Sequence, residues 1–132
     1  MKKVDYYLEK DGDIQSCPVR SVMDRLGDKW SILVVLILGD GEPKRFNELH
    51  KEIGDISQKM LTVTLRVLEA DGLVKRVVYA EVPPRVEYTI TPMGKSLVPH
   101  IDGLASWAVA NMPAIKKSRQ QFQKRSIAAP TV

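Results

Sequence analysis

Residues 45–90 constrain the fold more than any other part of the chain. They contain a short amphipathic helical pattern, a turn, a second amphipathic helical pattern, and two strand-like runs on either side of a Pro-Pro-Arg sequence. Two helices joined by a few residues can place the second one in a DNA major groove, and a hairpin that follows can act as a wing. The pattern predicts a winged helix-turn-helix, in a fold that is mainly α with a small β-hairpin.

The first helix of this motif is predicted from Phe46, Leu49 and Ile53, which recur at helical spacing, with Asn47 near its start. Residues 54–56, Gly-Asp-Ile, predict the turn. Ser57 then predicts an N-cap, because its hydroxyl can accept a hydrogen bond from the unpaired amides of the next helix. The helix pair is thus bounded by residues whose chemistry suits each position.

The second helix is predicted to have one buried and one exposed face. Leu61, Leu65 and Leu68 lie at i, i+4 and i+7 and form the buried stripe. The other face offers groups that suit base edges, thymine methyls and phosphates. Its side chains are those of Gln58, Lys59, Thr62, Val63 and Arg66. Such a mixture is also common on a solvated helix, but the turn before it and the hairpin after it favour DNA contact.

Two strands are predicted at residues 73–80 and 86–90, which are rich in β-branched and aromatic residues. Pro83 and Pro84 stiffen the tip between them, and Arg85 follows where it could reach a minor groove or a phosphate. Lys75 and Arg76 add charge at the base of the ribbon. These features predict the wing.

Helices are also predicted on both sides of this motif. Pro18 and Pro92 are each expected at a first helical position, where the missing N–H costs nothing. Residues 30–38 are apolar nearly all round and predict the central core helix, with Trp30 as a core residue. The helix after Pro92 is expected to kink at Pro99. Its apolar stripe has no core element left to cover it, so we expect pairing with a second subunit.

The charge of the chain is unevenly distributed. Residues 17–112 hold 12 basic and 12 acidic side chains, and residues 1–16 hold 3 and 4. The net charge of +4 therefore comes from residues 113–132, which carry five Lys or Arg and no acid. We divide the 132 residues into an extension (1–16), one domain with its dimerisation helices (17–112) and a basic tail (113–132). The tail is either a solvated, partly disordered segment or an aid to DNA affinity.

Several classes of protein do not fit the sequence. The longest apolar run, residues 32–38, is shorter than the roughly 20 residues of a membrane span, and the first residues lack a signal-peptide pattern. We therefore expect a cytoplasmic protein with no membrane partner. His50 and His100 are isolated, and no metal-ligand spacing, phosphate loop or nucleophile elbow is present. The sequence predicts no metal, no cofactor and no enzymatic activity.

Five segments, taken in order, resemble the HxlR-type winged-helix transcriptional regulators, relatives of the MarR group. They are CPV, GDKWSILVVLIL, RFNEL, ISQKMLTVTLRVLEADGLVKR and EVPPRVEYTITPMG, and the resemblance covers about residues 16–112. It implies a homodimer that binds a double-stranded DNA operator, with the second helix of the motif in the major groove. It also implies a dimer interface on the first and last helices. The apolar residues expected there are Val19, Leu97, Ile101, Leu104, Trp107 and Ala108.

The resemblance also implies which residues contact DNA. On the helix that faces the major groove these are Ser57, Gln58, Lys59, Thr62 and Arg66. Arg85 falls at the wing tip. Arg45 lies just before the first helix of the motif, where contact with the DNA backbone is expected.

Cys17 matches an N-terminal cysteine with which some members of this family sense electrophiles or oxidants. A helix N-terminus and the nearby Arg20 would stabilise its thiolate. A free cysteine is also a common buried hydrophobe, so a sensor and a structural residue are both open. Because Cys17 is the only cysteine, a switch would need a Cys17 pair across the dimer, a mixed disulfide with a small thiol, or alkylation.

Two functions follow from these patterns. The first is a sequence-specific, dimeric DNA-binding regulator with a small electrophile or oxidant as its effector. The alternative is a winged-helix module that binds protein and does not bind DNA. The zero net charge of residues 17–112 favours this alternative.

Overall fold

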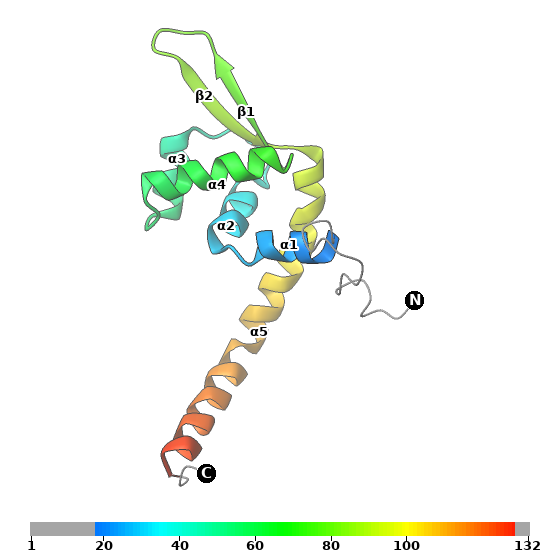
Figure 1. Ribbon diagram of the computed structural model, residues 1–132, viewed down its shortest axis with the longest axis vertical. Helices are drawn as coiled ribbons and strands as arrows, with labels where there is room; N and C mark the ends of the chain where they lie inside the picture. Colours follow the sequence, from blue (N-terminus) through cyan, green and yellow to red (C-terminus); the bar gives the residue numbers. More distant parts are fainter. Residues whose placement is uncertain (1–17, 129–132) are drawn as a thin grey trace. The chain divides into compact units, whose positions relative to one another are not determined.

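The computed structural model describes residues 18–128, and within them it contains five helices and a two-stranded sheet (Figure 1). The elements are α1 (Pro18–Leu26), α2 (Lys29–Leu38), α3 (Phe46–Ile53), α4 (Gln58–Ala70), β1 (Val74–Tyr79), β2 (Arg85–Ile90) and α5 (Pro92–Ala128). The chain divides into two compact units between Val98 and Pro99. The predicted class, mainly α with a small hairpin, is confirmed.

The helices begin where the sequence predicts. α1 and α5 start at Pro18 and Pro92, as the missing N–H of proline allows. The Ser57 hydroxyl accepts a hydrogen bond from the Met60 amide at 3.0 Å and caps α4. An Asp28 carboxylate oxygen accepts from the Trp30 amide at 3.1 Å and caps α2 in the same way. Local capping chemistry therefore defines the elements before any tertiary contact is considered.

The core of the first unit is built around α2. Leu38 of α2 and Leu49 of α3 are fully buried, as are the three leucines predicted for α4 and, nearly so, Val74 of β1. Ser31 and Thr64 are also buried, and each hydroxyl donates to an oxygen on its own segment. Trp30, expected in the core, is only half-buried, and the Lys29 Nζ lies 4.4 Å from its ring centroid. The core thus ends at the start of α2.

The hairpin is antiparallel, with Val74 opposite Ile90 and Tyr79 opposite Arg85. A short bridge extends it, because Lys44 and Tyr88 exchange backbone hydrogen bonds of 2.9 and 2.8 Å. The segment before α3 is therefore paired with β2. This long-range pairing, which the sequence did not predict, ties the wing to the helix-turn-helix.

The base of the hairpin is held against the start of α5. The Thr91 hydroxyl donates to the Gly72 carbonyl at 2.6 Å and accepts from the Gly94 amide at 3.0 Å. Gly94 lies directly against the Leu73 carbonyl, where a β-carbon would have no room. A glycine is required here by close approach of the backbone.

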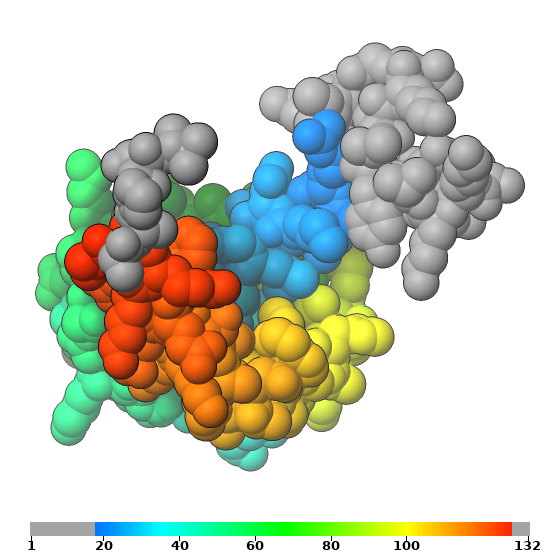
Figure 2. Space-filling view, turned by 90° about the horizontal axis from the view of Figure 1, so that it is seen from below, coloured from blue at the N-terminus to red at the C-terminus, as the bar shows by residue number. Residues whose placement is uncertain are grey.

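Helix α5 continues well past the expected end of the domain. It contains Pro99 and Pro113 and runs to Ala128, so most of the expected tail is helical. Beyond Pro99 most of its side chains are exposed, whereas Ile101 is buried. Figure 2 shows this part of the helix in orange to red. None of the helices within residues 18–128 has the length and apolar character to cross a membrane.

Candidate nucleic-acid interface

The exposed face of α4 is fixed by its buried face. Leu61, Leu65 and Leu68 are at most 1% exposed, so α4 cannot rotate without opening the core. The side chains of this helix and its N-cap that were expected to contact DNA lie on the opposite, exposed side. They are Ser57, Gln58, Lys59, Thr62 and Arg66. The structure therefore brings these five groups to one surface.

The two hydroxyls on this surface differ in what they can offer. The Ser57 oxygen accepts from the Met60 amide, so its own hydrogen is still available to a phosphate. The Thr62 hydroxyl donates to the Gln58 carbonyl at 2.8 Å, so its hydrogen is already used. Ser57 is thus the better donor to an anion, and Thr62 offers its methyl group.

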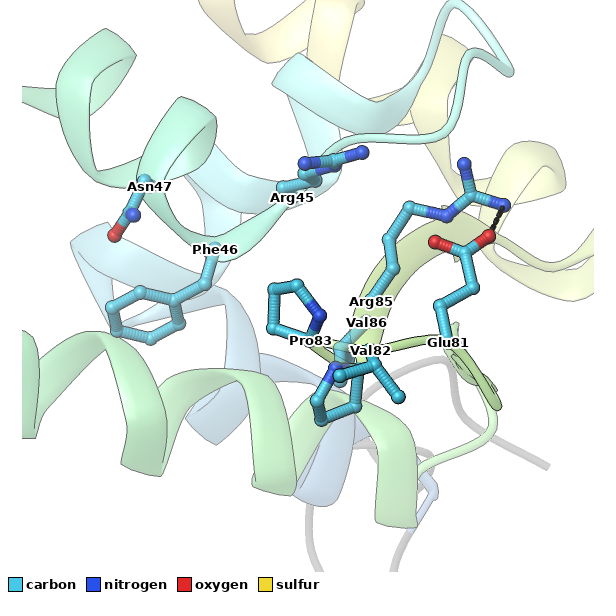
Figure 3. Close-up of a pocket in the computed structure, with 9 residues that line it drawn as sticks. Arg45, Phe46, Asn47, Glu81, Val82, Pro83, Arg85 and Val86 are labelled. Atoms are coloured by element: carbon cyan, nitrogen blue, oxygen red, sulfur yellow. Dashed lines mark ion pairs between the residues drawn. The ribbon is translucent and has the colours of Figure 1, made fainter.

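Arg45 lies at the mouth of a pocket between the start of α3 and the tip of the wing (Figure 3). Its backbone amide donates to a Glu48 carboxylate oxygen at 3.1 Å. Its guanidinium is exposed and, because it has no acceptor, takes no part in capping α3. Phe46 and Asn47 line the pocket beside it, and the wing contributes residues 81–86. Arg45 and Arg85, which are distant in sequence, therefore face one pocket.

Arg85 is the first residue of β2 and is occupied by contacts within the wing. Its Nη2 lies 3.3 Å from Glu81 (dashed in Figure 3), and its Nε lies 3.5 Å from Glu87. Its guanidinium also lies over the Tyr79 ring, at 4.2 Å from the centroid. The side chain is 31% exposed, so a DNA phosphate would have to compete with two carboxylates. The i, i+4 spacing of Glu81 and Arg85 was the signal in the sequence that could have indicated this ion pair.

Lys44 was not predicted to have a role, yet it supports this interface. Its Nζ lies 3.2 Å from Glu52 of α3 and 3.9 Å from Asp40. The hydrogen bond to Glu52, with the nearby carboxylates, raises the pKa of Lys44 above its ordinary value. Together with the backbone bridge to Tyr88, this ion pair holds the segment that carries Arg45.

A second ion pair holds the C-terminal end of α4. The Arg25 guanidinium of α1 forms two hydrogen bonds with the Asp71 carboxylate, which follows the last residue of α4. The Asp71 hydrogen bond is the largest cause of the raised pKa of Arg25. Both ends of α4 are therefore anchored, one by the Ser57 cap and the other by Arg25.

The residues expected at a dimer interface differ in exposure. Leu104 and Trp107 are 55% and 58% exposed, whereas Ile101 is 3% exposed within the single chain. Val19, Leu97 and Ala108 are half-buried. Of the six residues expected at the interface, Leu104 and Trp107 are therefore the most exposed. Cys17, the expected sensor, lies outside the described residues.

Among the described residues, no three His, Cys, Asp or Glu side chains come together as a metal site would require. The model of the HxlR-like helix-turn-helix family matches residues 25–116. An HTH-type transcriptional regulator of Methanothermobacter thermautotrophicus is 50% identical over 91 residues, which are 69% of each chain.

Two solved structures resemble the chain closely. The transcriptional regulator ytfH of Salmonella typhimurium gives a TM-score of 0.71 at 37% identity, over 83% of this chain and 99% of that one. The redox regulator HypR in its reduced form gives 0.70 at 41% identity, over 76% and 98%. The chain therefore belongs to the HxlR-like helix-turn-helix family of transcriptional regulators.

Proposed function

We propose that this protein is a sequence-specific DNA-binding regulator that acts as a homodimer. The observation that carries the proposal is the exposed face of α4, which gathers amide, ammonium, guanidinium and hydroxyl groups on a helix fixed by the core. Membership in a family of winged helix-turn-helix transcriptional regulators supports it. The near-neutral charge of residues 17–112 means that affinity depends on a few placed cations and not on a general positive field.

In this proposal α4 enters the major groove from its N-terminal end. Gln58 and Lys59 reach base edges first, and Ser57 donates to a phosphate through its free hydroxyl hydrogen. Arg45 contacts the backbone beside α3. Arg85 reaches the backbone or the minor groove from the wing once it leaves Glu81 and Glu87.

The DNA-binding proposal is tested with Lys59→Ala on a duplex that the wild-type protein selects from a randomised pool. Loss of one base contact should weaken binding to this duplex about tenfold and change binding to a scrambled duplex little. Lys95→Ala, which removes the same charge from the exposed face of α5, is the matched control. Equal affinities of the two variants would contradict the role of α4. A wild-type protein without salt-sensitive binding to any duplex would favour the protein-binding alternative.

The homodimer is proposed from the exposed apolar side chains of α5 and tested separately. Leu104→Asp should place a charge in the interface and shift the protein towards monomer in analytical ultracentrifugation. Lys116→Asp, which introduces the same side chain about three turns further along the helix, is the control. An unchanged sedimentation coefficient for Leu104→Asp would remove Leu104 from the interface.

A second candidate function, thiol sensing by Cys17, is favoured by the similarity to the redox regulator HypR. We propose that oxidation joins Cys17 to a partner's Cys17 or to a small thiol, or that an electrophile alkylates it. Diamide, which oxidises thiols, and a quinone, which alkylates them, should then each lower DNA binding of the wild type and leave Cys17→Ser unaffected. An identical response of both proteins would exclude the sensor.

A further inference from the structure

A narrow crevice separates the exposed face of α4 from the base of the wing. α4 contributes Thr62, Arg66 and Glu69, and the hairpin contributes Arg76 and Tyr88. These residues come from three elements of the first compact unit. The crevice is distinct from the pocket at the wing tip that Arg45 and Arg85 share.

The register of the hairpin explains why Arg76 is there. Arg76 is opposite Tyr88, and Tyr88 is only 9% exposed, so this pair belongs to the face of the hairpin that turns towards α4. Side chains alternate between the two faces of a strand, so the neighbouring Lys75 belongs to the other face. Two adjacent cations of β1 thus point in opposite directions, and only Arg76 joins Arg66.

The two arginines of the crevice are also not ion-paired within the described residues. Within residues 18–128, neither Arg66 nor Arg76 has a carboxylate within ion-pair distance, whereas Arg85 has two. Glu69 lines the same crevice and offsets one of the two charges there. A single positive charge therefore remains, presented by two planar groups that are built for bidentate contacts.

We propose that this crevice binds one phosphate of the DNA backbone, held jointly by Arg66 and Arg76. Guanidinium groups match the geometry of phosphate oxygens, and charge-assisted hydrogen bonds of this kind are the strong ones. The Thr62 hydrogen is used within α4, so the two arginines supply the donors. This inference rests on the proposed DNA binding. It assigns Arg66 to the backbone and adds Arg76, which the sequence pattern indicated only as charge at the base of the ribbon, as a second contact.

The experiment measures affinity against salt for Arg66→Ala, Arg76→Ala and the double variant, on the selected duplex and on a scrambled one. A phosphate contact carries no sequence information, so each single substitution should weaken both duplexes about equally, by roughly tenfold at low salt. The double variant should lower the slope of log affinity against log salt by about 0.9, the value for one phosphate. A decrease in slope twice as large would indicate two separate phosphate contacts and would overturn the proposal of one shared phosphate.

Lys75→Ala is the matched control, because it removes the same charge from the adjacent position on the opposite face of β1. Arg76→Lys keeps the charge but loses the planar guanidinium with its bidentate donors, so it should retain only part of the wild-type affinity. If Arg76→Ala behaves like Lys75→Ala while the wild type binds DNA, this inference is wrong and the proposed function stands. If the wild type itself shows no salt-dependent binding to either duplex, both fail. All these positions are exposed, so thermal unfolding curves should coincide with that of the wild type.

Discussion

The tip and the base of the wing each hold an arginine, yet the two arginines are in opposite situations. Arg85, at the tip, is paired with Glu81 and Glu87 and lies over Tyr79. Arg76, towards the base, shares a crevice with Arg66 and has no carboxylate partner within the described part of the chain. Each of the two arginines carries the same formal charge. What differs is how much of that charge an incoming phosphate can use without first displacing another anion.

The place of a cation in a motif therefore does not determine whether its charge is available to bind a phosphate. Exposed ion pairs are weak, about 0–1 kcal/mol, so Arg85 is restrained and not blocked. A small energetic difference of this size still changes affinity severalfold. The wing therefore has an arginine without an ion pair towards its base and an ion-paired arginine at its tip, within the described part of the chain.

The largest effect is expected from disrupting the contact between the base of the hairpin and α5, which positions the wing and both of its arginines. Gly94→Ala would place a β-carbon against the Leu73 carbonyl and within 2.8 Å of Ile90, at the point where the hairpin meets α5. Overpacking against backbone should cost about 3 kcal/mol of unfolding free energy, measured by urea titration at fixed protein concentration. Both arginine sites should be lost together.

The control for that substitution lies on the same helix. Gly103 has nothing within 4 Å of its would-be β-carbon. Gly103→Ala should therefore stabilise the helix by up to about 1 kcal/mol. A Gly94→Ala protein as stable as the wild type would show that the contact between Leu73 and Gly94 does not hold the wing.

A direct test of the comparison sets Arg76→Ala against Arg85→Ala in DNA binding at low salt. We expect Arg76→Ala to weaken binding roughly tenfold and Arg85→Ala no more than about threefold, because Arg85 gives up its ion pairs to bind. Fluorescence anisotropy with one duplex measures both. A larger loss for Arg85→Ala would reverse the assignment of the two sites.

The smallest effect is expected from removing one ion pair of Arg85 at the tip of the wing. Glu81→Gln removes one partner of Arg85 and preserves the shape of the side chain, so affinity for any duplex should rise about twofold. The gain should disappear when Arg85→Ala is combined with it. A gain that survives in the double variant would come from the lost negative charge alone and not from freeing Arg85.

Local patterns were sufficient for most of the elements. Pro18 and Pro92 marked helix starts and Ser57 marked a cap, because each acts within one turn of its own position. The leucine spacing of α4 identified its buried face, and thereby its exposed face, for the same reason. The helical continuation of α5 to Ala128 was not predicted, because proline at position 113 and a run of like charges argue against a helix locally.

The sequence by itself determined the winged helix-turn-helix and the family, through spacing, caps and ordered motifs that act over a few residues. Which cations are ion-paired follows from the tertiary structure alone, because ion pairs and crevices join groups that are distant in the chain. Lys44 with Glu52, Arg25 with Asp71, and Arg66 beside Arg76 are all of this kind. Their energies depend on distance in space, which no local pattern encodes.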